Sequence, residues 1–119
     1  MDSIFVFGSN LAGRHGKGAA LYAREHRGAI TGQGEGRMGT CYALPTKDEN
    51  MNVRSLPEIE ASIVRFLDQV SMEDYKETVV FMVTPIGTGL AGYSKRKIAT
   101  LFKGKDIPPN VVFTKEWFE

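Results

Sequence analysis

The sequence predicts an α/β domain in which four strands alternate with three helices. Short β-branched and aromatic runs end at glycine or proline, and stretches with helical character lie between them. The connections are too long for hairpins, which favours a mixed or parallel sheet with helices on its faces. We therefore expect a single domain over residues 1–119 with the order β-α-β-α-β-α-β.

The first unit is a strand, a glycine-rich loop and a helix. Residues 3–7 predict a buried strand, the loop spans 8–18, and good helix formers fill 19–26. Residues 28–39 hold five glycines, too many for a helix or a regular strand, so we expect an extended connector. Its charged residues, Glu35 and Arg37, are compatible with a flap over a ligand or with a solvent-exposed loop.

The middle of the chain predicts a second strand over 40–44, closed by Pro45, and then a polar stretch. Ser55 and Glu58 have the spacing of a capping box, which indicates the start of a helix. The apolar residues of this helix recur at helical spacing and should be buried; they are Ile59, Ile63, Phe66, Leu67 and Val70.

The last part predicts two further strands around a helix. Residues 78–83 are nearly all apolar, as expected for a strand covered on both faces, and 111–114 form the final strand. Between them, a second glycine-rich loop over 85–92 leads to Ser94, which can cap a helix. That helix should bury Ile98, Leu101 and Phe102. We expect Trp117 and Phe118 to pack on the core, with an interface as the alternative.

Composition restricts the classes of partner. The 15 basic and 14 acidic residues give a net charge of +1, so no long-range field recruits DNA or a membrane, and an anion site must be local. No apolar run is long enough for a membrane helix, and the start lacks a secretory signal, so we expect a cytoplasmic protein. The single Cys41 should be a buried core residue. His15, His26 and the carboxylates form no metal-ligand spacing, so no metal or cofactor is expected.

The two glycine-rich loops indicate a site for a phosphate-bearing, nucleotide-like ligand. Loops that follow the strands of an α/β sheet collect ligands, and glycines let backbone N–H groups approach an anion. Gly8 and Gly13 have the separation of a phosphate loop, but Arg14 and His15 follow where that motif has Lys and Ser or Thr. Glycine-rich turns without a ligand are the alternative. His15 could donate a proton or contact a phosphate in this basic loop.

Three short motifs carry a resemblance to a known family. The segment Pro85-Ile-Gly-Thr-Gly-Leu-Ala-Gly92 resembles the second ligand loop of the macrodomains, the ADP-ribose-binding modules. The segment His15-Gly-Lys-Gly-Ala-Ala20 is similar to one in the branch of DNA ADP-ribosyl glycohydrolase antitoxins and terminal ADP-ribose glycohydrolases. Leu44-Pro-Thr-Lys47 resembles the strand end that carries the catalytic lysine there. The resemblance implies an unusually short version of a compact three-layer α/β/α sandwich with a mixed sheet.

The resemblance also implies roles for individual residues. Lys47 would be catalytic, attacking C1″ of the ribose or stabilising the opened sugar. The ligand-binding residues would be Asn10, Gly16, Lys17 and Gly18 on one side, with Ile86, Gly87, Thr88, Gly89 and Leu90 closing over the diphosphate. His15, from the loop's own chemistry, joins this set.

Two functions follow from these assignments. The first is hydrolysis of an ADP-ribosyl bond on a protein, a nucleic-acid base or a small molecule. The second is a non-catalytic reader, or a protein that sequesters ADP-ribose-related signalling nucleotides; Ala91 favours it, because some hydrolases of the branch have aspartate there. An unrelated phosphate ligand is the third reading. A structural nucleic-acid-binding protein is weakly supported, although contact with a modified nucleic acid is compatible with the hydrolase. The sequence does not predict the oligomeric state.

Overall fold

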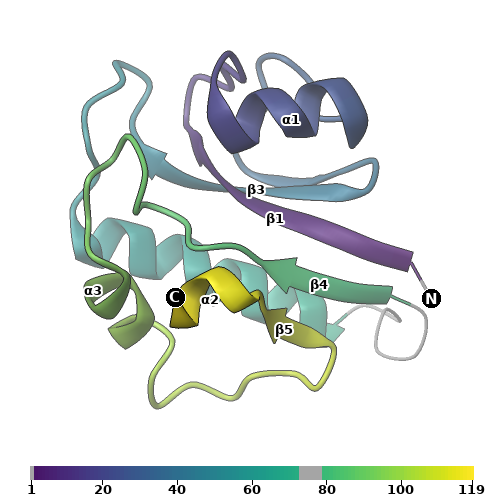
Figure 1. Cartoon of the computed structure of the whole chain (residues 1–119), viewed down its shortest axis with the longest axis vertical. Helices are drawn as coiled ribbons and strands as arrows, with labels where there is room; N and C mark the ends of the chain where they lie inside the picture. The colour runs from purple at the N-terminus through teal and green to yellow at the C-terminus, as the bar shows by residue number, and fades with distance from the viewer. Residues whose placement is uncertain (1, 73–78) are drawn as a thin grey trace.

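Five strands form one mixed sheet in the order β2-β3-β1-β4-β5, in a computed structural model that describes residues 2–72 and 79–119 (Figure 1). Strand β1 pairs in parallel with both β3 and β4, and β4 pairs in parallel with β5. Strand β2 is antiparallel to β3. The strands are β1 (Asp2–Asn10), β2 (Gly36–Met38), β3 (Cys41–Lys47), β4 (Val79–Val83) and β5 (Val111–Phe113). The α/β class and the mixed sheet are therefore confirmed.

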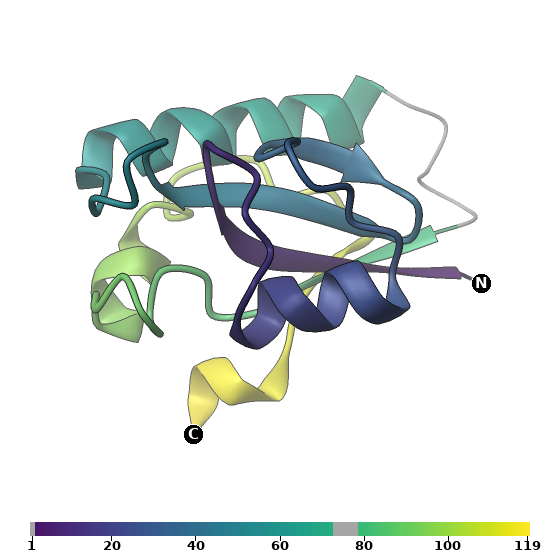
Figure 2. The same cartoon turned by 90° about the horizontal axis from the view of Figure 1, so that it is seen from above.

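Helices lie on both faces of this sheet (Figure 2). The helices are α1 (Gly18–His26), α2 (Leu56–Met72), α3 (Lys95–Thr100) and the short 3₁₀ helix η1 (Lys115–Phe118). Side chains alternate along β1, so Ile4 and Val6 pack in the cluster with α2, whereas Phe7 packs in the cluster with α1. Alternate side chains of β1 thus contribute to the hydrophobic clusters on both faces of the sheet.

Helix α2 begins as the capping box predicts. The backbone N–H of Ser55 donates to Glu58 Oε1 at 3.0 Å, and the N–H of Glu58 lies 3.4 Å from Ser55 Oγ. The predicted apolar face is buried at every position: Ile59, Ile63, Phe66, Leu67 and Val70. The start and the buried face of this helix are therefore confirmed.

The connector differs from the expectation, because it contains β2. Residues Gly36–Met38 pair with Ala43–Cys41, which adds a strand before β3. The glycines had argued against a regular strand, but a three-residue edge strand needs few ladder bonds, and Gly36 enters it at a φ of 105°. The order is thus β-α-β-β-α-β-α-β rather than the predicted one.

Strand β3 continues through Pro45 to Lys47, so the prediction that Pro45 closes the strand is wrong. Pro45 lies two residues beyond Ala43, the last partner of β2, and its missing N–H therefore costs no bond to that strand. Its carbonyl instead accepts a hydrogen bond from Arg54 Nη1 at 2.9 Å. This extension brings Lys47 to the edge where the site lies.

Strand β4 is covered fully on one face only. Phe81 and Val83 are buried against the α2 cluster, but Met82 is 37% exposed. Helix α1 packs on β1, and its cluster includes residues of β3 rather than β4, so the expected cover on both faces is wrong. Thr78, the predicted first residue of this strand, lies outside the described residues.

Of the remaining predictions for single residues, those for Cys41 and Trp117 are confirmed and that for Phe118 is wrong. Cys41 is buried, and burial raises the pKa of its thiol to about 11. Trp117 packs against the core and donates its indole N–H to the Val83 carbonyl at 2.7 Å, whereas Phe118 is 81% exposed. Ile98, Leu101 and Phe102 are buried as expected, although α3 ends at Thr100. In the described part of the chain, no helix is long and apolar enough to span a bilayer.

Candidate functional site

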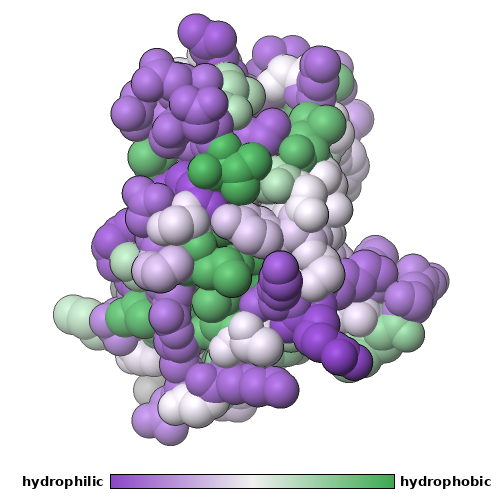
Figure 3. All heavy atoms as spheres, turned by 90° about the vertical axis from the view of Figure 1, so that its left-hand side faces the viewer, coloured by the Kyte–Doolittle hydropathy of each residue, from purple (hydrophilic) through white to green (hydrophobic). Residues whose placement is uncertain are grey.

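A cavity of about 760 Å³, which we call the cleft, lies at the carboxyl ends of β1, β3 and β4. Figure 3 shows this face, with hydrophobic side chains at its centre and hydrophilic ones around them. Both glycine loops line it, and so does the end of β3. It brings together all but one of the residues implicated from the sequence: Asn10, Gly16, Lys17, Gly18, Lys47, Ile86, Gly87, Thr88, Gly89 and Leu90.

Three chain segments meet closely at the floor of the cleft. A Cβ atom on Gly8 would lie 3.3 Å from the Gly87 backbone nitrogen. One on Gly87, whose φ is 74°, would lie 3.0 Å from Ile98 Cδ1 and 3.4 Å from Thr46 Cγ2. Only glycine allows this approach, so Gly8 and Gly87 set how near the second loop comes to β1 and β3.

Helix α1 begins at the cleft without a cap. Its N-cap residue, Lys17, makes no side-chain hydrogen bond to the helix, and Gly18, Ala19 and Ala20 line the cavity. Within the described residues, the N–H groups of these three residues have no hydrogen-bond acceptor. Free donors at the positive end of a helix dipole form an anion site. Cβ atoms on Gly16 and Gly18 would meet open space.

The second glycine loop presents further free donors. Thr88 turns its side chain inward, since its hydroxyl donates to the Pro85 carbonyl at 2.7 Å. The N–H groups of Gly87, Gly89 and Leu90 find no acceptor among the described residues. Leu90 at the tip of the loop is 72% exposed, and a Cβ atom on Gly89 would meet open space. The backbone of this loop can therefore approach a ligand.

Positive charge is concentrated in the cleft. Its charged lining residues are Arg14, Lys17, Lys47, Lys95 and Glu116. With four of the chain's 15 basic residues and one of its 14 acidic ones, the lining has a formal charge of +3 and the rest of the chain −2. Lys47 is half-buried, pairs in register with Asn10, and its ammonium has no partner among the described residues. Basic side chains are thus concentrated in the cleft, although the chain as a whole is nearly neutral.

Asn10 lines the cleft, but its amide holds the first loop together. Its Oδ1 accepts the N–H of Arg14 at 2.9 Å, and its Nδ2 donates to the carbonyl of the same residue at 2.8 Å. The side chain is buried and both ends of the amide are used. Asn10 therefore shapes the loop that carries Arg14, and its side chain has little capacity left for a ligand.

The structure places His15 away from the cleft, against the prediction that it contacts the ligand. The imidazole is 1% exposed and stands edge-on to the Phe7 ring. Its Nε2 lies 3.1 Å from the Ile30 carbonyl and 3.0 Å from the Gln33 carbonyl. Since carbonyls only accept, Nε2 carries the hydrogen and ties the first loop to the connector. The basic sequence around His15 gave no sign of this burial.

The connector, residues 28–39, packs against the first glycine loop and supports it. It is therefore neither a flap over the cleft nor a solvent-exposed loop. The N–H of Gly32 donates to the Gly13 carbonyl at 3.0 Å, and the Ser9 hydroxyl donates to the Gly34 carbonyl. A Cβ atom on Gly34 would lie 2.1 Å from the Asn10 carbonyl oxygen. The glycines of the connector therefore serve close backbone packing.

An ion pair fixes the connector to α2. Arg65 binds both carboxylate oxygens of Glu35, at 2.6 and 2.9 Å, and Ser62 donates to the same carboxylate at 3.2 Å. Burial raises the pKa of Glu35, but the hydrogen bonds and charge of Arg65 outweigh it, and the net pKa lies below the ordinary value. The connector is thus held from both sides.

Arg54 joins the supports of the cleft, and sequence reasoning did not find it. Its Nη1 donates to the Pro45 carbonyl and to Ser62 Oγ, both at 2.9 Å. Its own carbonyl accepts the Tyr93 hydroxyl at 2.7 Å, and Tyr93 follows the second loop. One buried guanidinium residue therefore links the end of β3, helix α2 and the base of the second loop.

Met51 is a lining residue with an unusual backbone. Its φ is 67°, which is rare for a side chain other than glycine, and it lies in the turn that follows Lys47. Asp48 Oδ1 holds that turn by accepting the N–H groups of Asn50 and Asn52 at 2.8 and 2.9 Å. The sequence carried no signal for Met51 or Glu116.

In residues 2–72 and 79–119, no three or more His, Cys, Asp or Glu side chains gather in a way that could hold a metal ion. Comparisons of the chain with models of known protein families, with curated proteins and with solved structures find no match.

Proposed function

We propose that the cleft binds ADP-ribose or an ADP-ribosyl derivative. The diphosphate would lie against the uncapped start of α1 and the free N–H groups of the second glycine loop. The observation that carries this proposal is that two separate segments direct unpaired donors to one cavity with a formal charge of +3. Its volume of about 760 Å³ lies within the range of ligand sites.

The three motifs that resemble those of macrodomains lie together at the cleft, which supports ADP-ribose as the ligand. The residues at 16–18, Lys47 and the residues at 86–90 come from distant parts of the chain, and all line the cleft. A site for phosphate alone would need only the free N–H groups at the start of α1 and in the second glycine loop. The lysine at the end of β3 and the cavity beyond the donors favour a larger ligand that carries a sugar.

We further propose that Lys47 hydrolyses an ADP-ribosyl bond. Unprotonated Nζ would form a bond to C1″ while the bond to the attached group breaks, and that group leaves with the electron pair. Water would then replace Nζ at C1″ and its remaining proton would end on the departed group, which releases ADP-ribose and restores the unprotonated lysine. The free Lys47 side chain at the cleft supports this role.

A non-catalytic reader is the alternative, and one observation favours it. Glu116 is the sole carboxylate among the lining residues that the structure describes, and it comes from η1 rather than from the turn after Lys47. Proton transfer to a leaving group or from water would then lack a paired carboxylate. Ala91 lines the cleft at the position where some hydrolases have aspartate.

Calorimetric titration with ADP-ribose tests the binding proposal. Gly16 has no positive φ and a methyl group there meets open space, so Gly16→Ala should fold normally and bind at least tenfold more weakly. Lys97→Ala, at an exposed position outside the cleft lining, is the matched control and should bind like the wild type. No binding by the wild type would contradict the proposal.

Turnover separates the two functions. Wild type and Lys47→Ala should be incubated with ADP-ribosylated protein, oligonucleotide and small-molecule substrates, and the products analysed by mass. Release of ADP-ribose by wild type but not by the variant supports the hydrolase. Binding with every substrate recovered unchanged supports the reader, and equal turnover by both proteins contradicts the role of Lys47.

A further inference from the structure

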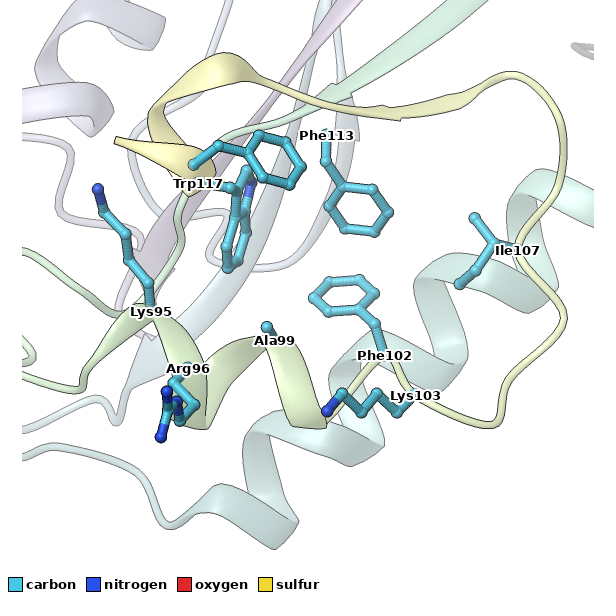
Figure 4. A pocket seen from close by; sticks show the side chains of 9 residues that line it. Lys95, Arg96, Ala99, Phe102, Lys103, Ile107, Phe113 and Trp117 are labelled. Atoms are coloured by element: carbon cyan, nitrogen blue, oxygen red, sulfur yellow. The ribbon is translucent and has the colours of Figure 1, made fainter.

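A second cavity, of about 450 Å³, lies between α3, β5, η1 and the segment that joins α3 to β5 (Figure 4). We call it the aromatic pocket. Its apolar lining residues are Ala99, Phe102, Ile107, Phe113, Trp117 and Phe118. Lys95 is the one residue that it shares with the cleft as lining, so the two cavities are distinct neighbours.

The rings of the aromatic pocket are held in place. Phe102 and Phe113 meet edge-to-face with centroids 5.0 Å apart, and Trp117 stands edge-on to Phe113 at 5.8 Å. The indole is fixed further by its hydrogen bond to the Val83 carbonyl. Because these rings already pack against one another, the pocket needs no rearrangement to accept a ligand.

The margin of the pocket is cationic. Figure 4 shows Lys95 and Arg96 at the start of α3 and Lys103 beyond its end, on the border of the aromatic side chains, and no acidic residue is part of the lining. Lys95 donates to the Glu116 carbonyl, but Arg96 and Lys103 have no side-chain hydrogen bond or ion pair to any described residue. An occupant with a negative group would therefore pair with two free cations.

We propose that the aromatic pocket binds a small aromatic anion, a planar ring system that bears a carboxylate or sulfonate. Fixed rings favour a planar partner, since face and edge contacts add to the burial of apolar surface. The free cations select a negative substituent at the margin over a neutral one. This inference does not rest on the function proposed for the cleft.

The single tryptophan of the chain makes the pocket directly observable. Trp117 lines the pocket, so its fluorescence reports occupancy without added labels. The probes are naphthalene-2-carboxylate and its neutral analogue 2-naphthylmethanol, titrated by fluorescence with calorimetry as a check. We expect the carboxylate to quench Trp117 and to bind about fivefold to tenfold more tightly than the alcohol.

Variants test the role of the two cations. The double variant Arg96→Gln, Lys103→Gln should weaken the carboxylate to the level of the alcohol and leave the alcohol unchanged. Lys97→Gln, on the same helix but outside the lining, should alter neither probe. All three changes are at exposed positions, so the fold should be retained.

Several results would overturn the proposal. Equal affinity for the two probes would indicate an unselective apolar surface, and no quenching at millimolar concentration would show that the pocket takes no such ligand. If ADP-ribose displaces the carboxylate, the pocket is part of the nucleotide site. If the wild type dimerises by sedimentation and the dimer does not bind the probe, a second copy covers the pocket.

Discussion

Helices α1 and α3 each follow a glycine loop at the cleft, yet they begin in different ways. Helix α3 is capped, since Ser94 Oγ accepts the N–H of Lys97 at 3.2 Å. Helix α1 has Lys17 at the same position, with no capping bond, and its first N–H groups line the cleft. A cap supplies stability, whereas its absence beside a cavity leaves donors for an anion. Because of this difference, we propose that the start of α1 is the principal anion site.

The two glycine loops also differ in how tightly they are packed. The first loop packs against the connector: Gly13 and the buried His15 of the loop, and Gly34 of the connector, make close contacts between them. The second loop carries an exposed tip at Leu90 and a Gly89 without neighbours on its Cβ side. We infer that the first loop is a fixed wall of the cleft, preorganised for the ligand, and that the second loop is a wall with room to adapt. Each prediction below separates the roles of these two walls.

The largest effect is expected for Gly34→Ala. A methyl group there would lie 2.1 Å from the Asn10 carbonyl oxygen, and both groups belong to backbone that cannot move easily. We expect a loss of about 3 kcal/mol in the free energy of unfolding, measured by urea denaturation. Gly16→Ala, which meets open space, should change this energy by less than about 0.5 kcal/mol. Equal stability of the two variants would contradict the bracing role of the connector.

His15→Leu should destabilise the protein by about 2 kcal/mol, because it leaves the Gln33 carbonyl without a donor and removes one of the two donors to the Ile30 carbonyl. Thermal and urea unfolding measure this loss. His26→Leu, at an exposed position, serves as the control and should have little effect. A His15 variant of normal stability that no longer binds ADP-ribose would instead restore His15 as a ligand contact.

Exchanging the helix starts tests the comparison itself. Lys17 has an extended backbone (φ −147°, ψ 155°), as N-cap residues have, so Lys17→Ser can cap α1. Compared with Lys17→Ala, which removes the same charge, it should be more stable by about 1 kcal/mol and bind ADP-ribose more weakly.

Ser94→Ala at the other helix should cost about 1 kcal/mol and leave the affinity unchanged. Denaturation and calorimetry on the three proteins give both quantities. Tighter ADP-ribose binding by Lys17→Ser than by Lys17→Ala would show that the first N–H groups of α1 are not the anion site.

The smallest effect concerns the ion pair that holds the connector. Because the folded-state pKa of Glu35 lies below its ordinary value of 4.5, its contribution is present above that pH and is lost as the pH falls through the folded pKa. Since Arg65 is half exposed, we expect Glu35→Gln to cost less than about 1 kcal/mol at pH 7. The gap between variant and wild type should close as the pH falls below 4.5 and through the folded-state pKa in denaturation series. A gap that is independent of pH would contradict the charge-based account.

Local signals in the sequence were sufficient for some elements. The capping box at Ser55 and the spacing of Ile59 and Ile63 specify α2, because both depend on residues within one or two helical turns. The position of Lys47 at the cleft also followed from a short motif at a strand end. The start of α2 and the presence of Lys47 at the cleft could thus be predicted, although β3 ends at Lys47 rather than before Pro45.

Other features depend on contacts that are distant in the chain. His15 looked like a ligand contact beside Arg14 and Lys17, but the carbonyls of the connector bury it. The glycines of the connector predicted only an extended segment, whereas their small size serves packing against the first loop. Met51 reaches the cleft only because the Asp48 turn holds it at a positive φ. None of these contacts leaves a periodic pattern in the sequence.

The most direct test of the central claim is a titration of ¹⁵N-labelled protein with ADP-ribose, followed through backbone amide shifts. We expect the largest downfield shifts at residues 18–20 and at Gly87, Gly89 and Leu90, whose N–H groups have no acceptor among the described residues, and none at the capped start of α3. The largest shifts at the aromatic pocket or at α3, or no shifts at saturating ligand, would contradict the account.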